Sequence, residues 1–486
     1  MSKKFSKILT SVLVICISVN FTACSSSSTP SSPDSPSNVD APSEQILLTM
    51  WHYYNNNIKD ILDSQIQEFN ETIGKEKNII VDAYAYPSIQ SLPEAVLASA
   101  TNEIGAADMP DIFYAYADNA LALDELGIVA NLNDYFTDAE LSLYRAEFLE
   151  EGRFDAEQNL KILPVSKSTE ALFINRTDFD AFAADTGKSY DLSTWQGLAS
   201  TAEAYYNYTD AKTDTPNDGY ALFGLDGFAN TMIISAKQLG EDIYTYDNGS
   251  VTFNLTESSA KLIWENLITP YVKGHFAAYG RFRSDDIKSG DLLAYTGSTA
   301  SALFFPDEVI VDQTNSYGID HLIMPYPVFQ GADNIMIQQG AGIIITPSNA
   351  ERERAAVEFV KWLSEPEQNI EFAVATGYIP VYNESLNYDA IIDSIEDTTS
   401  IVASVSDVVY NDMLVNYQAF TLPPFENSYS IRIDLDAYIQ SHIDDTITTL
   451  DNFIANGVHR EDALNNLLSE ERFSQWYTGL KDTIEK

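Results

Sequence analysis

The chain has 486 residues, enough for two large lobes or three ordinary domains, and its 45% hydrophobic content is normal for a globular protein. Its formal net charge of −45 repels phosphate backbones, so we exclude DNA and RNA as partners. The two cysteines, Cys16 and Cys24, both lie near the N-terminus, so we expect no disulfide or thiol chemistry in the folded part.

The N-terminus has the pattern of a bacterial lipoprotein. Three lysines precede an apolar run at 8–19, which is shorter than the about 20 residues of a membrane-spanning helix. The sequence Phe-Thr-Ala-Cys then resembles a lipobox, so we expect 1–23 to be a signal peptide and Cys24 to carry the lipid (palmitate). Residues 24–44 are rich in Ser and Pro, as in a flexible tether. These features predict a lipid anchor at the extracytoplasmic face of the cell membrane.

Aromatic residues follow the first predicted strand, at 46–50, and precede a predicted helix at 58–73. Ligands in open α/β sheets bind beyond the carboxyl ends of strands. A ring-lined wall for an amphipathic ligand is therefore one reading of this stretch, and plugs of the hydrophobic core are the other. The rings belong to Trp51, His52, Tyr53 and Tyr54.

The next two predicted strands also end in polar or aromatic residues. The strand at 79–81 leads to Tyr86, and the strand at 112–114 leads to Tyr116 and Asp118. Asp118 is either a ligand contact or the N-cap of a helix at 119–126.

In the middle of the chain, Lys167 and Glu170 are polar candidates beside a predicted strand, and Arg281 precedes a helix. Ser298 and Thr299 follow a short strand at the start of a helix. Their hydroxyls and backbone N–H groups would suit a sugar hydroxyl or an anion, or Ser298 would simply be an N-cap.

The stretch from 336 to 381 predicts a loop, a strand and two helices. Gln339 and Gly340 lie in the loop, and the run at 343–345 predicts a buried strand. Capping boxes are expected at Ser348 with Glu351, and at Ser364 with Glu367. Gly377 is the expected end of the second helix. Further on, Tyr429 and Arg432 open a helical region that continues to the C-terminus.

Three parts of this stretch resemble extracellular solute-binding proteins: QQGAGIIIT (338–346), AAVEFVKWL (355–363) and EQNIEFAVATGYIPV (367–381). These are the maltose-binding-like and glycerol-phosphate-binding-like proteins that feed ABC importers. The resemblance implies a two-lobe α/β fold of the type II periplasmic-binding class, with three hinge crossings and a ligand cleft between the lobes. The N-lobe would comprise 45–165 and 326–376, and the C-lobe 166–325 and 377–486.

The resemblance also implies a function without bond breaking: a monomer captures a sugar or oligosaccharide by lobe closure and delivers it to the permease subunits. In such relatives an aromatic residue and an arginine on the late helix face the ligand, which points to Tyr429 and Arg432. The expected ligand-binding residues are Trp51, His52, Tyr53, Tyr54, Tyr86, Tyr116, Asp118, Lys167, Glu170, Arg281, Ser298, Thr299, Gln339, Gly340, Tyr429 and Arg432.

Three alternatives stay open at this stage. The ligand would be a glycerol phosphate in the same transport role, the protein would sense a ligand for a membrane receptor, or it would be a secreted glycan-active hydrolase. A hydrolase needs two carboxyl groups about 5–10 Å apart across a cleft. The five histidines are scattered, and no HExxH, GxSxG or Walker A motif occurs, so we expect no metal, cofactor or catalytic site.

Overall fold

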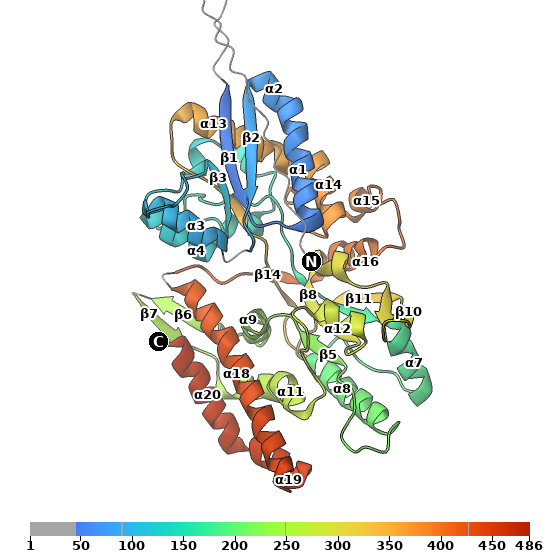
Figure 1. Ribbon diagram of the computed structural model, residues 1–486. Helices are drawn as coiled ribbons and strands as arrows, with labels where there is room; N and C mark the ends of the chain where they lie inside the picture. The colour runs from blue at the N-terminus through green and yellow to red at the C-terminus, as the bar shows by residue number, and fades with distance from the viewer. Residues whose placement is uncertain (1–44, 89–90, 248, 426) are drawn as a thin grey trace, which may run out of the picture. The chain divides into compact units, whose positions relative to one another are not determined.

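The computed structural model describes residues 45–88, 91–247, 249–425 and 427–486 (Figure 1). The predicted signal peptide, Cys24 and the tether lie outside the described residues. The predicted mixed α/β fold is confirmed, because helices cover two separate four-stranded sheets.

The first sheet has the strand order β13-β3-β1-β2. Its strands are β1 (Ile46–His52), β2 (Ile79–Ala85), β3 (Ile112–Ala115) and β13 (Gly342–Ile345). The first three run parallel, while β13 is antiparallel to β3 although it lies more than 200 residues later. β3 and β13 are buried throughout, which explains their continuous apolar sequences.

Three helices, α1 (Asn56–Glu71), α13 (Ala350–Ser364) and α14 (Pro366–Thr376), pack against one another beside this sheet (Figure 1). Phe69 of α1 is fully buried and its ring lies 4.9 Å from that of Phe359. Two further helices, α3 (Ser91–Ala100) and α4 (Ala117–Glu125), contact each other and flank β3 in the sequence.

The second sheet has the order β11-β4-β8-β5. Its strands are β4 (Glu170–Asn175), β5 (Phe223–Leu225), β8 (Ala294–Ser298) and β11 (His321–Pro325). β4 is antiparallel to both β11 and β8, and β5 is parallel to β8. The helices α7 (Arg176–Thr186), α8 (Trp195–Asp210) and α9 (Phe228–Gln238) belong to this part. Trp195 is fully buried at the start of α8, so it packs in the core.

Three two-stranded ladders complete the strands: β6 (Tyr244–Asp247) with β7 (Ser250–Phe253), β9 (Glu308–Ile310) with β10 (Ser316–Gly318), and β12 (Ile335–Ile337) with β14 (Gln418–Phe420). The shorter helical elements are α2 (Ile73–Lys77), η1 (Leu132–Asp134), α5 (Asp138–Leu141), α6 (Ala146–Glu150), α10 (Glu257–Ile263), η2 (Trp264–Ile268), α11 (Thr269–Lys273), α12 (Arg283–Ser289), η3 (Thr299–Phe304), η4 (Asn383–Ser385), α15 (Tyr388–Ile392), α16 (Ile401–Val408), η5 (Val409–Met413) and α17 (Leu414–Asn416).

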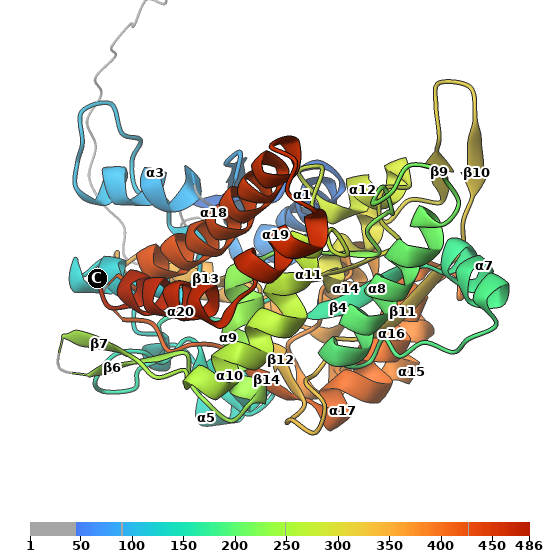
Figure 2. The ribbon, with the colours of Figure 1, turned by 90° about the horizontal axis from the view of Figure 1, so that it is seen from below.

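The predicted helical region at the end of the chain is confirmed and comprises three helices: α18 (Ser428–Ala455), α19 (Arg460–Leu467) and α20 (Glu470–Ile484). α18 contacts both α19 and α20, and the three lie together in Figure 2. Leu435, Ile439 and Ile443 form the buried stripe of α18 at helical spacing.

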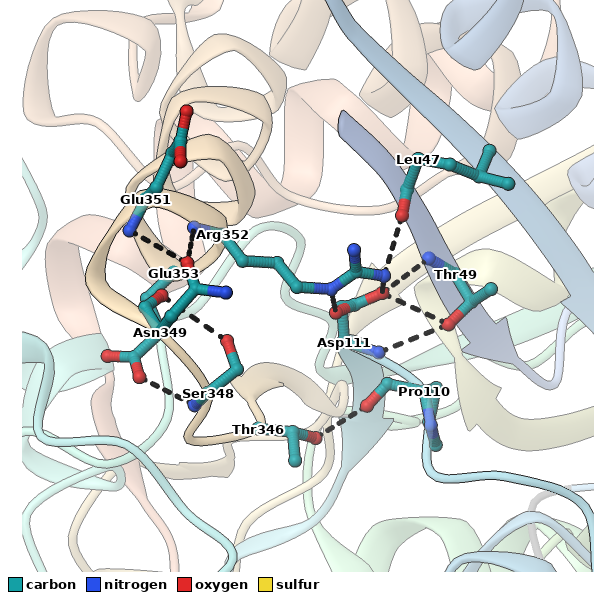
Figure 3. A network of polar contacts seen from close by, with 10 residues as sticks. All are labelled: Leu47, Thr49, Pro110, Asp111, Thr346, Ser348, Asn349, Glu351, Arg352 and Glu353. Atoms are coloured by element: carbon teal, nitrogen blue, oxygen red, sulfur yellow. Dashed lines mark hydrogen bonds and ion pairs between the residues drawn. The ribbon is translucent and has the colours of Figure 1, made fainter. Parts of the chain in front are cut away.

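A polar network ties α13 to the first sheet (Figure 3). The guanidinium of Arg352 forms an ion pair with Asp111 through both Nε and Nη2, and Nη2 also donates to the carbonyl of Leu47. Asp111 in turn accepts hydrogen bonds from the backbone N–H and the hydroxyl of Thr49. One carboxylate therefore links α13, β1 and the start of β3.

Both predicted capping boxes are wrong. Asn349, not Ser348, is the N-cap of α13, because its side chain accepts from the N–H groups of Glu351 and Arg352. Ser364 ends α13 and its hydroxyl donates back to the carbonyl of Val360, while α14 starts at Pro366 without a side-chain cap. The expected helix end is confirmed, since Gly377 follows α14 with a φ of 75°.

Two other helix boundaries differ from prediction. The first helix spans Asn56–Glu71 rather than 58–73, because Thr72 breaks the helical backbone before the separate turn of α2. Asp118 is not an N-cap: Tyr116 holds that position, and Asp118 lies in the first turn of α4, where its carboxylate accepts from the N–H of Asn119.

Candidate functional site

Three chain segments from different parts of the sequence lie side by side between the two sheets. Lys167 and Ile379 exchange backbone hydrogen bonds of 2.9 and 2.6 Å, and Ser168 and Gln339 exchange bonds of 3.0 and 2.9 Å. The first segment leads from β3 to β4, the second from β11 to β13, and the third leaves α14. Paired backbone groups therefore hold together the three places where the chain passes between the sheets.

Two glycines allow this close approach. Gly340 has a φ of +98°, and a Cβ atom there would lie 2.7 Å from the carbonyl oxygen of Ser166. Gly377 has a φ of +75°, and its Cβ would lie 2.6 Å from the carbonyl oxygen of Thr299. Both the backbone conformation and the lack of space require glycine at these positions.

Lys167 is 2% exposed and already has partners within the chain. Its ammonium lies 2.5 Å from Oε2 of Glu151 and donates to the carbonyl of Gly340 at 2.8 Å. Gln338 donates to the same Glu151 oxygen at 2.6 Å. This arrangement favours a role for Lys167 in holding the segments in place, because little of its charge is available to a ligand.

A chain of polar contacts begins at Glu170, which opens β4 and is 4% exposed. Its Oε1 accepts from the side-chain amides of Asn230 (3.1 Å) and Gln339 (2.8 Å). Arg432 donates through Nη2 to Oδ1 of Asn230 at 2.8 Å, and its Nη1 lies 3.7 Å from Oδ2 of Asp118. We call these five residues the Glu170 network.

Members of the Glu170 network come from elements around both sheets. Asp118 lies on α4 after β3, and Gln339 lies in the loop before β13 of the same sheet. Glu170 begins β4, while Asn230 and Arg432 lie on α9 and α18, which contact each other. The start of α9 is fixed by Asp436 of α18, whose Oδ1 accepts from the N–H groups of Phe228 and Ala229.

Burial controls the charge state of the two acids in the network. It raises the pKa of Glu170 to about 7, against the hydrogen bonds from Asn230 and Gln339, and the neighbouring Asp226 raises it further. Burial also raises the pKa of Asp118, while Arg432 lowers it. The carboxyl group of Glu170 therefore gains or loses its proton near neutral pH, and it can donate a hydrogen bond only in the protonated form. Both of its hydrogen bonds within the chain end on Oε1.

Aromatic rings lie beside this network. Tyr54 is 2% exposed, its ring lies 4.9 Å from that of Tyr53 and 5.2 Å from that of Tyr114, and its hydroxyl is 3.1 Å from Ser166 Oγ. The ring of Tyr378, on the segment that leaves α14, lies 5.9 Å from the ring of Tyr54. We call Tyr53, Tyr54, Tyr114 and Tyr378 the tyrosine cluster.

Tyr116 links the tyrosine cluster to the Glu170 network. Burial raises the pKa of Tyr116, and Arg432 and Tyr53 both act to lower it, which places the phenol near both residues. Burial likewise raises the pKa of Tyr53 well above its usual range, so this phenol stays protonated and can donate. Both side chains are partly exposed, unlike Tyr54.

Other predicted site residues pack elsewhere or are buried. Trp51 is 5% exposed and 5.0 Å from Tyr86, and His52 is fully buried, with Nδ1 accepting from the N–H of Tyr54. Trp51 and His52 therefore pack in the hydrophobic core, which is the second of the two alternatives predicted for this stretch. Tyr429 is partly exposed in the first turn of α18.

Arg281 does not join the Glu170 network. Its side chain is exposed and its guanidinium lies 5.1 Å from the ring centroid of Phe282. Ser298 stands opposite Glu170 in the β4–β8 ladder, but its hydroxyl accepts from the N–H of Ala300 and caps η3. Thr299 is fully buried, and its N–H donates to the carbonyl of Thr169.

In the described part of the chain, no group of three or more His, Cys, Asp or Glu side chains is arranged to hold a metal ion. Across the same residues, no helix has the length and apolar character needed to cross a membrane.

Residues 64–397, more than half of the chain, match the family model of the bacterial extracellular solute-binding proteins. The chain belongs to this family. The solute-binding protein is also similar to a curated relative, the sn-glycerol-3-phosphate-binding periplasmic protein UgpB of Salmonella typhimurium. The two are 23% identical over 355 residues, which cover 69% of this chain and 74% of the relative.

Solved structures of other solute-binding proteins share the fold. The cyclic alpha-maltosyl-1,6-maltose binding protein of Arthrobacter globiformis aligns with a TM-score of 0.63 at 17% identity, covering 90% of this chain and 100% of that one. UgpB of Mycobacterium tuberculosis, in complex with glycerophosphocholine, aligns with a TM-score of 0.60 at 15% identity, covering 89% and 98%. At these identities the likeness establishes the fold of this solute-binding protein, which is that of two-lobe binding proteins.

Sequence reasoning missed several residues of the site. Asn230 is central to the Glu170 network, and Glu151 pairs with Lys167, yet neither belongs to a motif. Tyr378 lies in a stretch that resembles the family but is not among the predicted ligand-binding residues. Its position directly after Gly377, on a segment expected to pass between the lobes, was the one available signal.

Proposed function

We propose that this solute-binding protein captures a small polyhydroxylated ligand, a sugar or oligosaccharide, at the Glu170 network and delivers it to an ABC permease without changing it. The observation that carries the proposal is that the Glu170 network joins elements of both sheets at the three crossing segments. A ligand held there contacts both lobes at once, so its binding energy favours the closed arrangement.

The polar groups of the network suit hydroxyl groups of a ligand. Glu170 uses Oε1 for both of its hydrogen bonds, so Oε2 is available to a ligand. Asp118 and Arg432 are 3.7 Å apart, which leaves room for both to form shorter bonds to a sugar hydroxyl. Tyr53 and Tyr116 supply partly exposed rings next to these groups, on which the apolar face of a sugar can stack.

A glycerol-phosphate-type ligand is the second candidate, and the curated relative named for such a ligand favours it. The charges in the site favour the neutral sugar. Lys167 is paired with Glu151, and Arg432 faces Asp118, so each cation of the site already has a carboxylate neighbour. A phosphate would have to compete with these carboxylates.

We further propose the lobe boundaries expected from the sequence, 45–165 with 326–376 and 166–325 with 377–486, and a monomeric binding protein. A lipid on Cys24 and the tether at 24–44 would keep the binding protein at the membrane, close to the permease.

The test is a thermal-shift and calorimetric panel of maltotriose, cyclic maltosyl-maltose, sn-glycerol 3-phosphate and glycerophosphocholine. Because a ligand stabilises the folded state by mass action, the true ligand raises Tm with concentration. We expect an oligosaccharide to bind and to be recovered intact by chromatography. Binding of the phosphodiester or phosphate alone overturns the sugar assignment, and cleavage of any panel member overturns the transport role in favour of a hydrolase.

A further inference from the structure

Asp226 lies at the same edge of the second sheet as Glu170, but it is outside the Glu170 network. It directly follows β5, and its N–H donates to the carbonyl of Thr296 on the neighbouring β8 at 3.3 Å. On the other side of β8, Glu170 stands opposite Ser298 at the start of β4. The carboxyl ends of β5 and β8 and the amino end of β4 therefore meet at one edge, and both acids lie there.

The carboxylate of Asp226 lies over β8, the strand between its own strand and that of Glu170. Gly297 of β8 has no side chain, and a Cβ atom there would lie 3.2 Å from Oδ2 of Asp226. Gly297 pairs with Ala171, the neighbour of Glu170 in the chain. The negative charge of Asp226 also raises the pKa of Glu170, as expected of a carboxylate close by. The two acids are therefore neighbours in space.

Asp226 has few partners within the chain. Its Oδ1 accepts one long hydrogen bond, of 3.4 Å, from the N–H of Arg283. The guanidinium of Arg283 pairs with Asp286 instead, at 2.6 Å. In the described part of the chain Asp226 forms no ion pair, and its Oδ2 accepts no hydrogen bond. Oδ2 is therefore open to a donor from a bound molecule, as is Oε2 of Glu170.

Solvent reaches Asp226, whereas it hardly reaches Glu170. Glu170 is 4% exposed, and the side chain of Asp226 is exposed. The protein atoms around Asp226 still raise its pKa by partial burial, so the carboxylate is not surrounded by water on all sides. A molecule that enters from solvent and binds at the Glu170 network therefore meets Asp226 without a rearrangement of the chain.

The two open oxygens determine which ligand groups fit at this edge. Oδ2 of Asp226 and Oε2 of Glu170 are both acceptors without a donor from the chain. A hydroxyl group of a ligand supplies such a donor. A phosphate dianion has only acceptor oxygens, and the charge of Asp226 repels it.

We propose that Asp226 is a specificity-determining residue of the ligand site, which accepts a hydrogen bond from a ligand hydroxyl and disfavours a ligand that carries a phosphate. This inference rests on the proposed function, because it takes the Glu170 network as the place where the ligand binds. It goes further by assigning the discrimination between neutral polyols and phosphate esters to a single carboxylate.

Asp226→Asn tests the assignment, because it keeps an oxygen for the N–H of Arg283 and removes the charge. We expect the affinity for maltotriose to fall about tenfold, since a charge-assisted hydrogen bond to a hydroxyl is lost. The affinity for sn-glycerol 3-phosphate should rise about threefold or more, since the repulsion is removed. A variant with a merely structural defect would bind both more weakly. Isothermal titration calorimetry measures both affinities.

Asp291→Asn is the matched control. Asp291 is an exposed carboxylate that precedes β8, at the opposite end of this strand from Asp226, so both affinities should stay unchanged. The inference is overturned if Asp226→Asn lowers both affinities or changes neither. If the unsubstituted protein binds the phosphate ester and no sugar, the sugar assignment of the proposed function fails. The rise in phosphate affinity in Asp226→Asn then decides the role of Asp226 by itself.

Discussion

Arg432 and Asp118 meet at 3.7 Å between Nη1 and Oδ2, although they belong to helices of different sheets. Asp118 follows β3 on α4, and Arg432 lies on α18, which packs against α9. The same guanidinium holds Asn230 through Nη2. Arg432 therefore connects an element that follows the first sheet with a helix that packs beside the second.

The first prediction concerns this arginine. We expect Arg432→Ala to weaken maltotriose binding about tenfold or more, because a charge-assisted hydrogen bond to the ligand and the link to Asn230 are both lost. The side chain is 38% exposed, so the folded state itself should change little. Isothermal titration calorimetry measures the affinity. Arg354→Ala, at an exposed position of α13, is the matched control, and equal affinities in both variants would contradict the assignment.

The second prediction tests the crossing segments. Gly340→Ala introduces a Cβ atom 2.7 Å from a backbone oxygen in a left-handed conformation, so we expect a loss of about 3 kcal/mol or more in unfolding free energy. Gly331→Ala is the control: its φ is +77°, but no atom lies within 4 Å of the added Cβ, so its cost should stay near about 1 kcal/mol. Urea unfolding compares the two, and similar losses would argue against tight packing at Gly340.

A third prediction concerns the network in Figure 3. Asp111→Asn keeps an acceptor for Thr49 but removes the charge that pairs with Arg352, so we expect a loss of about 1–3 kcal/mol. Asp63→Asn removes an exposed partner of Lys59 on α1 and should cost no more than about 0.5 kcal/mol. Chemical denaturation of both variants measures the difference. An equal effect would mean that the Asp111 pair contributes no more than a surface pair.

The fold could be predicted from the sequence because its signals are local. The apolar runs of β1, β3 and β13 and the periodic face of α13 each depend on neighbouring residues. The capping boxes failed for a similar reason: Ser348 fits the pattern, but the adjacent Asn349 has an equally good capping side chain and takes the position. Sequence patterns of this kind predict that a helix or strand is present, and they place its ends to within a residue or two.

The site could be predicted only in part, because its contacts are long-range. The sequence predicts Glu170, Gln339 and Arg432 as ligand-binding residues, and the structure brings all three into one network. Asn230, which joins them, looks like any polar residue of a helix. Its role depends on three segments far apart in the sequence, and one sequence does not specify which of its polar residues meet.

The fourth prediction concerns the proposed lipid anchor. Cys24→Ala should release the protein from the membrane into the soluble fraction and abolish incorporation of labelled palmitate, because the thiol that accepts the lipid is lost. Cys16→Ala removes the only other cysteine and should leave both properties unchanged. Detergent phase partitioning of cell extracts measures the outcome. Continued partitioning of Cys24→Ala into the detergent phase would contradict lipidation at this residue.

The last prediction concerns the pH dependence of stability. Burial raises the pKa of Glu170 from 4.5 to about 7, so between these values the folded chain holds a proton that the unfolded chain has lost. Raising the pH through this window therefore removes stability, by about 3 kcal/mol at completion. Glu170→Gln cannot ionise and still accepts from Asn230 and Gln339, so its unfolding free energy should decline less between pH 4.5 and 7. Glu367→Gln, at an exposed position of α14, controls for loss of one carboxyl group. Urea titrations across this range measure the slopes, and parallel slopes for Glu170→Gln and the unsubstituted protein would show that Glu170 ionises alike in both states.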